Sequence, residues 1–523
     1  MTSCGNPNVE KDALMERRPK YDGKTKICVK CKENQGNVVI RHAVYCKSCF
    51  FPLVQTRFKR TLEPSINPAP DGPRRKALRA AGSLAVGFSG GTCSMTLLDL
   101  VAKTYLTTRP TGNESMKGGT DHPRNSERGV WKGKPTVCYV EVCGAFSGQI
   151  DQTEVIRAIV ERYPNCPFEF IPLRLEDSFN PSWWSSVGGG NAVDSARSFG
   201  LDISDEELRL THISQSTPPD SSALTALKAY LSSVPTLTAV NSTIQTLIRL
   251  LLFHTAAAHN ASHLLLGTSL TSLSVNLISG IAQGSGFAVA EEAKEEWTPR
   301  PARGLPVRVV RPLRDVGVKE CAIWNWWAGL HPVDRPWYPS GAGKNAVDSL
   351  TRDFIFGLET DYPATVSTIA RTCGKLASKE DSDERCILCE RPAQRRVQDW
   401  KAQISIRSYS DATPAVSGIT KPTHLSDDEI SNLTQAKQES KPEPSLAPYL
   451  CYACHTTLTS RSIRGMTAPL SAQRAKETPL PMWVRSTLDG VVAKDSVDSE
   501  MIQSKKLTSQ DIKSQIEQYL IDE

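Results

Sequence analysis

The stretch "SLAVGFSGGTCSMTLLDLVAK", Ser83 to Lys103, predicts a strand, a glycine loop and a helix in direct succession. The run "SLAVGFS" is typical of a buried strand, and "MTLLDLVAKTYL" carries apolar residues at helical spacing. Two glycines between them allow close approaches that side chains would block, and the amides that begin the helix face an anion. A structural turn needs the same glycines, so the loop alone is weak evidence. Its candidate residues are Ser89, Gly90, Gly91, Cys93 and Ser94.

The same alternation of strand and helix continues along the middle of the chain. Further strands are predicted at "PTVCYVEV", "FEFIPLRL", "HLLLGTS" and "VRVVRPLR", and helices at "DQTEVIRAIVERY", "STIQTLIRLLLFHTAAAH" and "KECAIWNWWAGL". Strands that alternate with helices indicate an α/β fold whose parallel, doubly wound sheet is covered on both faces. Ligands of such sheets bind at the carboxyl ends of the strands, where the glycine loop lies.

Eight of the fifteen cysteines form four pairs of the Cys-x-x-Cys type. This spacing aims two thiolates at one ion, and two pairs complete a tetrahedral zinc shell. "CVKC" and "CKSC" lie close together and predict a zinc ribbon. "CILCERP" and "CYACHTTL" are separated by 61 residues, mostly polar and rich in Pro and Ser, but a long loop does not forbid a shared site. The predicted ligands of structural zinc are Cys28, Cys31, Cys46, Cys49, Cys386, Cys389, Cys451 and Cys454.

A redox dithiol is the competing interpretation of the second set of cysteine pairs. It would require a thioredoxin-like βαβ context, which neither pair has. We also expect a soluble cytoplasmic protein, because the first residues contain no apolar signal region. The most apolar later run, "LIRLLLFHTAAAH", is interrupted by Arg249 and His254 and is too short to span a bilayer. No membrane partner is therefore expected.

Positive charge is concentrated at the front of the chain. Residues 1–80 hold 17 lysines and arginines against 7 acidic residues, although the whole chain carries a formal charge of only +6. This asymmetry indicates a polyanionic partner, although the charge alone indicates a solvated basic tail equally well. Basic residues follow the first ribbon directly and recur after a Pro-rich linker, which suits RNA phosphates. The predicted RNA-binding residues are Arg57, Lys59, Arg60, Arg74, Arg75 and Lys76.

"VGFSGGTCSMTLL" resembles the SGGxDS loop of adenylating ATP pyrophosphatases (the PP-loop superfamily), which includes tRNA thiolation enzymes. The N-terminal cysteine pairs, "LLLGTSLTSLSVNLISGIAQGSGFAV", "RPLRDVGVKE" and the C-terminal cysteine pairs are similar, in this order, to the cytoplasmic tRNA 2-thiolation protein 2 family. The resemblance covers most of the chain, from Cys28 to about Leu458. It implies a fold of the adenine nucleotide α-hydrolase-like type.

The chain departs from its catalytic relatives at the positions that carry chemistry. Cys93 stands where an active loop has an acid, and "TSLTSLSVN" replaces a run of His-Asn-x-Asp-Asp. The acids that would organise magnesium on ATP are missing at both places, so we do not expect this chain to bind ATP and magnesium productively. The cysteines that would present sulfur are absent as well, since none lies between Cys166 and Cys321. We expect no catalytic residue here.

The resemblance implies a subunit of the complex that 2-thiolates the tRNA wobble uridine, U34. In this interpretation the chain binds tRNA and forms a heterodimer with a catalytic paralogue, and sulfur arrives on a thiocarboxylated ubiquitin-like carrier. Whether the chain itself counts as an enzyme stays open. The alternatives are a self-sufficient ATP-dependent tRNA sulfurtransferase and a zinc-ribbon scaffold that binds only proteins.

Five segments are expected. They are a basic segment with a zinc ribbon at 1–60, a linker at 61–80, the PP-loop-like domain at 81–375, a zinc region at 376–460 with a disordered insert at about 405–448, and a tail at 461–523. Among single residues, Cys93 is interpreted as a small residue tolerated in the loop rather than a nucleophile. Cys321 and the tryptophans at 324, 326 and 327 are expected to pack rather than to contact ligands.

Overall fold

The centre of the molecule is a six-stranded sheet with the order β5-β4-β3-β8-β10-β9. Its strands are β3 (Ser83–Gly87), β4 (Thr136–Glu141), β5 (Glu169–Arg174), β8 (Ala261–Leu266), β9 (Glu296–Trp297) and β10 (Arg308–Val310). The computed structural model describes residues 27–67, 78–106, 130–146, 148–163, 168–189, 199–203, 208–212, 223–294, 296–297, 306–333, 346–376, 385–393, 397, 445–460, 478–485 and 487–488.

The strand order confirms the predicted doubly wound sheet. β5, β4, β3, β8 and β10 are mutually parallel, and the short edge strand β9 runs antiparallel to β10. The chain builds one half outward from β3 to β4 and β5, then returns to place β8 on the other side of β3. The direction of winding therefore reverses between β3 and β8, and ligands of open α/β sheets bind at such a reversal.

Helices cover both faces of the sheet because its strands are apolar on both sides. Leu84 and Val86 of β3 are buried with apolar residues of α1 (Lys47–Ile66), α2 (Thr92–Val101) and α10 (Val318–Ala328). Ala85, between them, points to the opposite face and packs in the cluster that contains α7 (Leu237–Ala258). This alternation is what a parallel strand between two helical layers requires.

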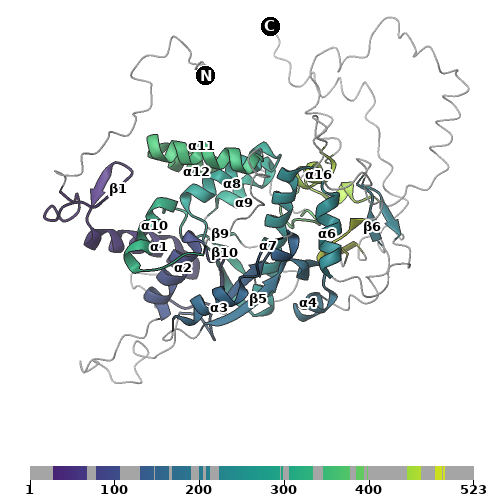
Figure 1. Ribbon diagram of the computed structural model, residues 1–523, viewed down its shortest axis with the longest axis horizontal. Helices are drawn as coiled ribbons and strands as arrows, with labels where there is room; N and C mark the ends of the chain where they lie inside the picture. The colour runs from purple at the N-terminus through teal and green to yellow at the C-terminus, as the bar shows by residue number, and fades with distance from the viewer. Residues whose placement is uncertain are drawn as a thin grey trace, which may run out of the picture.

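The remaining helices complete the two layers and add a third group. α3 (Thr153–Glu161), α4 (Pro181–Ser186) and α6 (Ala223–Ser233) lie beside the sheet, whereas α8 (Leu270–Ala282), α9 (Val289–Ala293), α11 (Val347–Asp361) and α12 (Pro363–Lys375) share their own apolar cluster. Figure 1 shows α11 and α12 side by side above α8 and α9. Among the described residues, no helix combines the length and the apolar character that crossing a bilayer requires.

The two sets of cysteine pairs lie at opposite ends of the long axis (Figure 1). The N-terminal set belongs to the hairpin of β1 (Val38–Ile40) and β2 (Ala43–Tyr45), which leads into α1. The C-terminal set adjoins α16 (Tyr452–Thr459). Helix α1 continues to Ile66, past the predicted boundary at residue 60, and its buried face packs on the sheet. The ribbon is thus joined rigidly to the α/β core.

Part of the predicted C-terminal tail belongs to the core. β11 (Thr478–Pro479) pairs with β6 (Phe199–Leu201), which pairs with β7 (Leu210–His212) in a small antiparallel sheet. Met482 and Trp483, which follow β11, are almost completely buried, and the Trp483 indole donates a hydrogen bond to the Leu388 carbonyl at 3.2 Å. Most of the insert predicted at 405–448 lies outside the described residues.

His263 of β8 is buried between the sheet and α1. The Trp131 indole lies 3.3 Å from its Nδ1, and its Nε2 lies 3.3 Å from the carbonyl oxygen of Ser65. The indole can only donate, so the imidazole is held neutral with its proton on Nε2. Burial lowers the pKa of His263 to about 4, and the nearby Arg308 guanidinium contributes.

We therefore expect the free energy of unfolding to fall as the pH drops from 6.5 to 4. The unfolded chain takes up a proton on this imidazole at the ordinary pKa of 6.5, whereas the folded chain resists until about 4. The His263→Gln variant should lack this component, on the order of 2 kcal/mol. Urea unfolding at both pH values measures this change in the free energy of unfolding. His331→Gln, at an exposed histidine, is the matched control. Equal pH dependence of the two variants would contradict the assignment.

Candidate functional site

The two cysteine groups share one local architecture. In each group, the first pair lies in a tight turn whose fifth residue has a left-handed backbone, with φ 59° at Lys32 and φ 53° at Glu390. The amide of that residue donates to the carbonyl of the first cysteine at 2.8 Å in both turns, to Cys28 and Cys386. The second pair of each group begins a helix. Cys46 caps α1 and Cys451 caps α16, and each is followed by its partner three residues later.

The sulfur positions fit a tetrahedral ion. Within each group all four sulfurs lie within 4.8 Å of one another. Cys31 and Cys46 are 3.8 Å apart, and Cys389 and Cys451 are 3.7 Å apart. Four sulfurs at the usual zinc distance of about 2.3 Å would be about 3.8 Å from one another. Both predicted groups are therefore assembled by the fold and can each hold a metal such as zinc.

Thiolates are favoured at both groups. A hydrogen bond from the Ser48 hydroxyl, 3.1 Å from the Cys46 sulfur, lowers the pKa of Cys46 to about 6, with further support from the Cys49 amide. Hydrogen bonds from the Cys386, Cys451 and Cys454 thiols lower the pKa of Cys389 well below its ordinary range. Because a metal binds thiolate rather than thiol, each group contains a ligand ready to bind near neutral pH.

The glycine loop follows β3 at the predicted place. Gly90 has φ +76°, and a Cβ there would lie 2.4 Å from the Ile156 side chain, so only glycine fits. The hydroxyls of Ser89 and Ser94 lie 3.1 Å apart, and Ser94 also donates to the Gly91 carbonyl at 2.9 Å. The hydroxyls are thus engaged within the loop itself.

The end of β8 meets this loop directly. A Cβ at Gly267 would lie 2.9 Å from the Cα of Ser94, so the turn after β8 contacts the start of α2. Ser269 caps α8 by accepting a hydrogen bond from the Ser272 amide at 3.2 Å. Neither α2 nor α8 has an acidic residue in its first turn. The two helix starts that face the reversal of the sheet therefore contribute hydroxyls and amides but no carboxylate of their own, although Glu359 of α11 accepts a hydrogen bond from Thr271 at 2.8 Å.

Cys93 lies between the loop and α10. Its thiol interacts with the Cys321 thiol, which lowers the pKa of Cys93, and Ser269 acts in the same direction against the effect of burial. Cys321 is completely buried, as predicted, and the same contact raises its pKa well above the ordinary range. Two further hydrogen bonds, from Thr96 to Asn325 and from Asn325 to the Thr92 carbonyl, tie α2 to α10.

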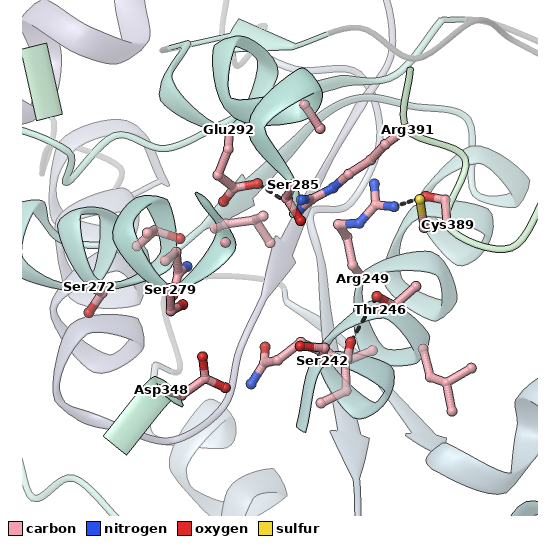
Figure 2. A pocket seen from close by; sticks show the side chains of 18 of the residues that line it. Ser242, Thr246, Arg249, Ser272, Ser279, Ser285, Glu292, Asp348, Cys389 and Arg391 are labelled. Atoms are coloured by element: carbon pink, nitrogen blue, oxygen red, sulfur yellow. Dashed lines mark hydrogen bonds and ion pairs between the residues drawn. The ribbon is translucent and has the colours of Figure 1, made fainter. Parts of the chain in front are cut away.

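A cavity of about 590 Å³ extends from this loop to the C-terminal cysteine group. Its walls come from the loop, α7, α8 and the turns that hold Cys389 and Cys451. Figure 2 shows Arg249 beside Cys389 and Glu292 at the guanidinium of Arg391, with Ser272 and Asp348 farther away. Sequence reasoning did not predict this charged cluster. Arg249 interrupts the apolar run of α7, which was the available signal.

The predicted basic residues differ in what they contact. Arg57 is mostly buried and forms an ion pair with Glu320 at 2.8 Å, so its guanidinium joins α1 to α10. Arg60 is 71% exposed and pairs with Asp315 at 2.7 Å, and Lys59 is half-buried. Arg74, Arg75 and Lys76 lie outside the described residues. RNA binding by this set stays a prediction, and its best-placed members in the described part of the chain are Lys59 and Arg60.

The tryptophan cluster is only partly buried. Trp324 is 4% exposed and donates to Asp99 at 2.8 Å, as expected for a packing residue. Trp327 is half-buried and contacts Phe50 of α1 edge to face. Trp326 is 75% exposed, so its predicted burial is wrong. It lies on the outer side of α10, where no described element covers it.

Comparison with known proteins is consistent with this architecture. The family model described as cytoplasmic tRNA 2-thiolation protein 2 matches residues 346–456. The chain is 25% identical to the Xenopus laevis cytoplasmic tRNA 2-thiolation protein 2-A over 476 residues, which cover 83% of this chain and 88% of that protein. The Danio rerio protein is 25% identical over 472 residues with the same coverage. The human protein is 27% identical over 403 residues, covering 69% and 71%.

Among solved structures, a U34-tRNA thiolase from Methanococcus maripaludis, NcsA with its [4Fe-4S] cluster, matches with a TM-score of 0.43 and 15% identity. The match covers 72% of this chain and 94% of that one. The curated relatives, by contrast, share one name and align over most of their length. The chain is thus similar over most of its length to proteins named cytoplasmic tRNA 2-thiolation protein 2, and the model of that family matches residues 346–456.

Proposed function

We propose that this chain is a non-catalytic, tRNA-binding subunit of a cytoplasmic complex that 2-thiolates uridine 34 of tRNA. The family and the names of its curated members support a role in tRNA 2-thiolation in the cytoplasm. The observation that carries the non-catalytic role is the meeting of the loop after β3 with the turn after β8. Neither following helix offers a carboxylate there, although activation of uridine by ATP needs a site for magnesium.

The chemistry in this proposal belongs to a catalytic paralogue that pairs with this chain. The resemblance of the sequence supplies the other components, which are ATP-dependent adenylation by the paralogue and sulfur delivery from a thiocarboxylated ubiquitin-like carrier. Purification of the tagged chain from cells should recover such a paralogue together with tRNA. Recovery of neither would favour the scaffold alternative.

Zinc in both cysteine groups would have a structural role here. Each group uses four cysteines, so a tetrahedral ion has no open position for substrate. At the N-terminal group the ion would fix the ribbon at the start of α1, whose exposed side carries Lys59 and Arg60. At the C-terminal group it would close one end of the cavity.

The self-sufficient sulfurtransferase has one observation in its favour. Cys93 lines the cavity, and its contact with Cys321 lowers its pKa. Low pKa is a property of reactive thiols. ATP–pyrophosphate exchange by the isolated chain distinguishes the two functions, and we expect no exchange.

Replacing Lys59 and Arg60 together with alanine should weaken tRNA binding and flatten its salt dependence. Each lost phosphate contact lowers the slope of log affinity against log salt by about 1. The control is the double variant Arg371→Ala and Lys375→Ala, which removes the same charge from exposed positions on α12. Arg57 is left intact because its removal would strand the buried Glu320. Filter binding at several salt concentrations measures the slopes; identical slopes would show that the α1 residues do not touch RNA.

A further inference from the structure

Three arginines gather at the end of the cavity that adjoins the C-terminal cysteine group. They belong to separate elements. Arg249 lies in α7, Arg311 directly follows β10, and Arg391 lies in the turn after Cys389. Glu292 of α9 contacts two of them, at 3.1 Å from Arg311 and at 2.7 Å from Arg391. Figure 2 shows its contact with Arg391. Arg311 is buried, whereas Arg249 and Arg391 are partly exposed. A buried arginine is unusual, since arginine is seldom buried without a matching partner.

Arg311 has hydrogen-bonding capacity that the described residues do not use. It is 3% exposed, and one nitrogen, Nη2, contacts Glu292. Its Nε and Nη1 are buried and have no acceptor among the residues that the structure describes. A guanidinium donor buried without an acceptor destabilises the fold. Because Arg311 lines the cavity, an acceptor placed in the cavity would remove this cost.

The charge at this end of the cavity is also incompletely balanced. Glu292 is shared by Arg311 and Arg391, and together with Arg249 they overcome the effect of burial and hold its pKa at about 2. Burial, together with repulsion from Arg391, lowers the pKa of Arg249 to about 10. The acidic Asp348 also lines the cavity, but it lies away from the arginines in Figure 2.

A metal-bound C-terminal cysteine group accounts for part of this cluster. Four thiolates around a divalent ion carry net negative charge, and Arg249 donates to the Cys389 carbonyl while Arg391 interacts with the Cys389 thiolate. Those two arginines therefore act as counterions of the cysteine group. Arg311 differs, because it pairs with Glu292 and its Nε and Nη1 form no hydrogen bond with the described residues. A further acceptor is needed at Arg311.

We propose that the arginine end of this cavity binds the phosphate group of a small molecule. Phosphate offers several oxygens to the guanidinium fork and matches its geometry. Hydroxyls of Ser279 and Ser285 line the same cavity and can donate to the remaining oxygens. The volume of about 590 Å³ suits a ligand of nucleotide size. Such binding needs no magnesium, and it concerns the isolated chain, so it does not depend on the proposed role in thiolation.

The probes are inorganic phosphate and ATP, titrated calorimetrically into the full-length, zinc-loaded chain without magnesium. We expect saturable binding of both phosphate and ATP. If the natural ligand is a nucleotide, ATP should bind more tightly than phosphate. If the natural ligand is free phosphate, the two affinities should be equal. Arg311→Lys keeps the charge beside Glu292 but lacks the two unused donors. The affinity of this variant for phosphate and ATP should therefore be about tenfold or more below that of the wild type. Arg385→Lys is the matched control, because Arg385 pairs with Glu291 at 3.3 Å and does not line the cavity.

A second measurement uses the unmodified chain, in case Arg311→Lys does not fold. Phosphate should shift the arginine Nε–H resonance that is assigned to Arg311. Absence of saturable binding of either probe would overturn the proposal, as would equal affinities of the two variants. Acetate that binds as tightly as phosphate would also contradict the assignment to a phosphate group. Thiolation in cells is a separate measurement, so failure here leaves the proposed function standing.

Discussion

Replacing Cys389 with serine should remove one zinc ion per chain and unfold the C-terminal half of the molecule. Cys389 and its three partner cysteines are all buried in the largest apolar cluster of the described residues, together with residues of α6 and α7 and with Leu480, which follows β11. The metal would cross-link residues 385–393 to residues 445–460, which are far apart in the sequence. Structural zinc contributes on the order of 10 kcal/mol of apparent folding free energy, which is comparable to the whole stability of a typical domain.

The N-terminal group offers an internal comparison. Cys46→Ser should also remove one zinc, but it should unfold mainly the β1–β2 hairpin, because α1 is held independently by its packing on the sheet. Cys373→Ser is the matched control, since Cys373 is 4% exposed and belongs to neither cysteine group. Elemental analysis should find two zinc ions in the wild type and in Cys373→Ser, and one in each of the other variants. A folded chain that contains no zinc would refute the metal assignment.

The sheet could be predicted from the sequence because its strands are short apolar runs between helical patterns. β3, β4, β5 and β10 lie within predicted strands, β8 overlaps its predicted strand but begins two residues earlier, and the glycine loop lies at the reversal of the sheet. The cysteine spacing likewise predicted both groups, even across the 61 residues that separate Cys389 from Cys451. The apolar runs of the strands and the spacing of the cysteine pairs are both local patterns in the sequence, and backbone geometry requires them.

The arginine cluster could not be predicted, because its members meet only through the tertiary fold. Arg249, Arg311 and Arg391 lie on three elements, and only Arg249, which interrupts an apolar run, stands out in its local context. Residues 478–488 were missed for a related reason. β11 contains only two residues, and Trp483 is buried by segments remote in sequence. Arg57 resembles a surface residue within "RFKR", but the turn of α1 places it against Glu320.

The exposure of Trp326 has a similar cause. "WNWWAG" contains three tryptophans within one turn of helix, and only one face of α10 can contact α1 and α2. Trp324 and Trp327 lie on that face, three residues apart, and Trp326 does not. Composition indicates an aromatic cluster, whereas the helical period determines which member is left outside.

Deleting this chain should abolish 2-thiolation of uridine 34 in cells, and restoring it as Cys93→Ser should bring thiolation back to the wild-type level. Serine keeps nearly the same size at the contact with Cys321 and Ser269, but it cannot carry sulfur. Cys93→Asp should not give the isolated chain thiolation activity. The start of α8 would still lack acidic residues, and the middle of the chain would still lack cysteines. Cys321→Ser controls for a purely structural effect at the same contact.

In the proposed function this chain supports thiolation without performing its chemistry. The most direct test is the retardation of thiolated tRNA in mercury-containing gels, with tRNA from deletion cells that express either the wild-type chain or Cys93→Ser. We predict the same fraction of retarded tRNA from both strains and none from the deletion alone. A Cys93→Ser chain that folds and binds its partner, yet yields no retarded tRNA, would contradict the account and make this cysteine a sulfur-handling residue.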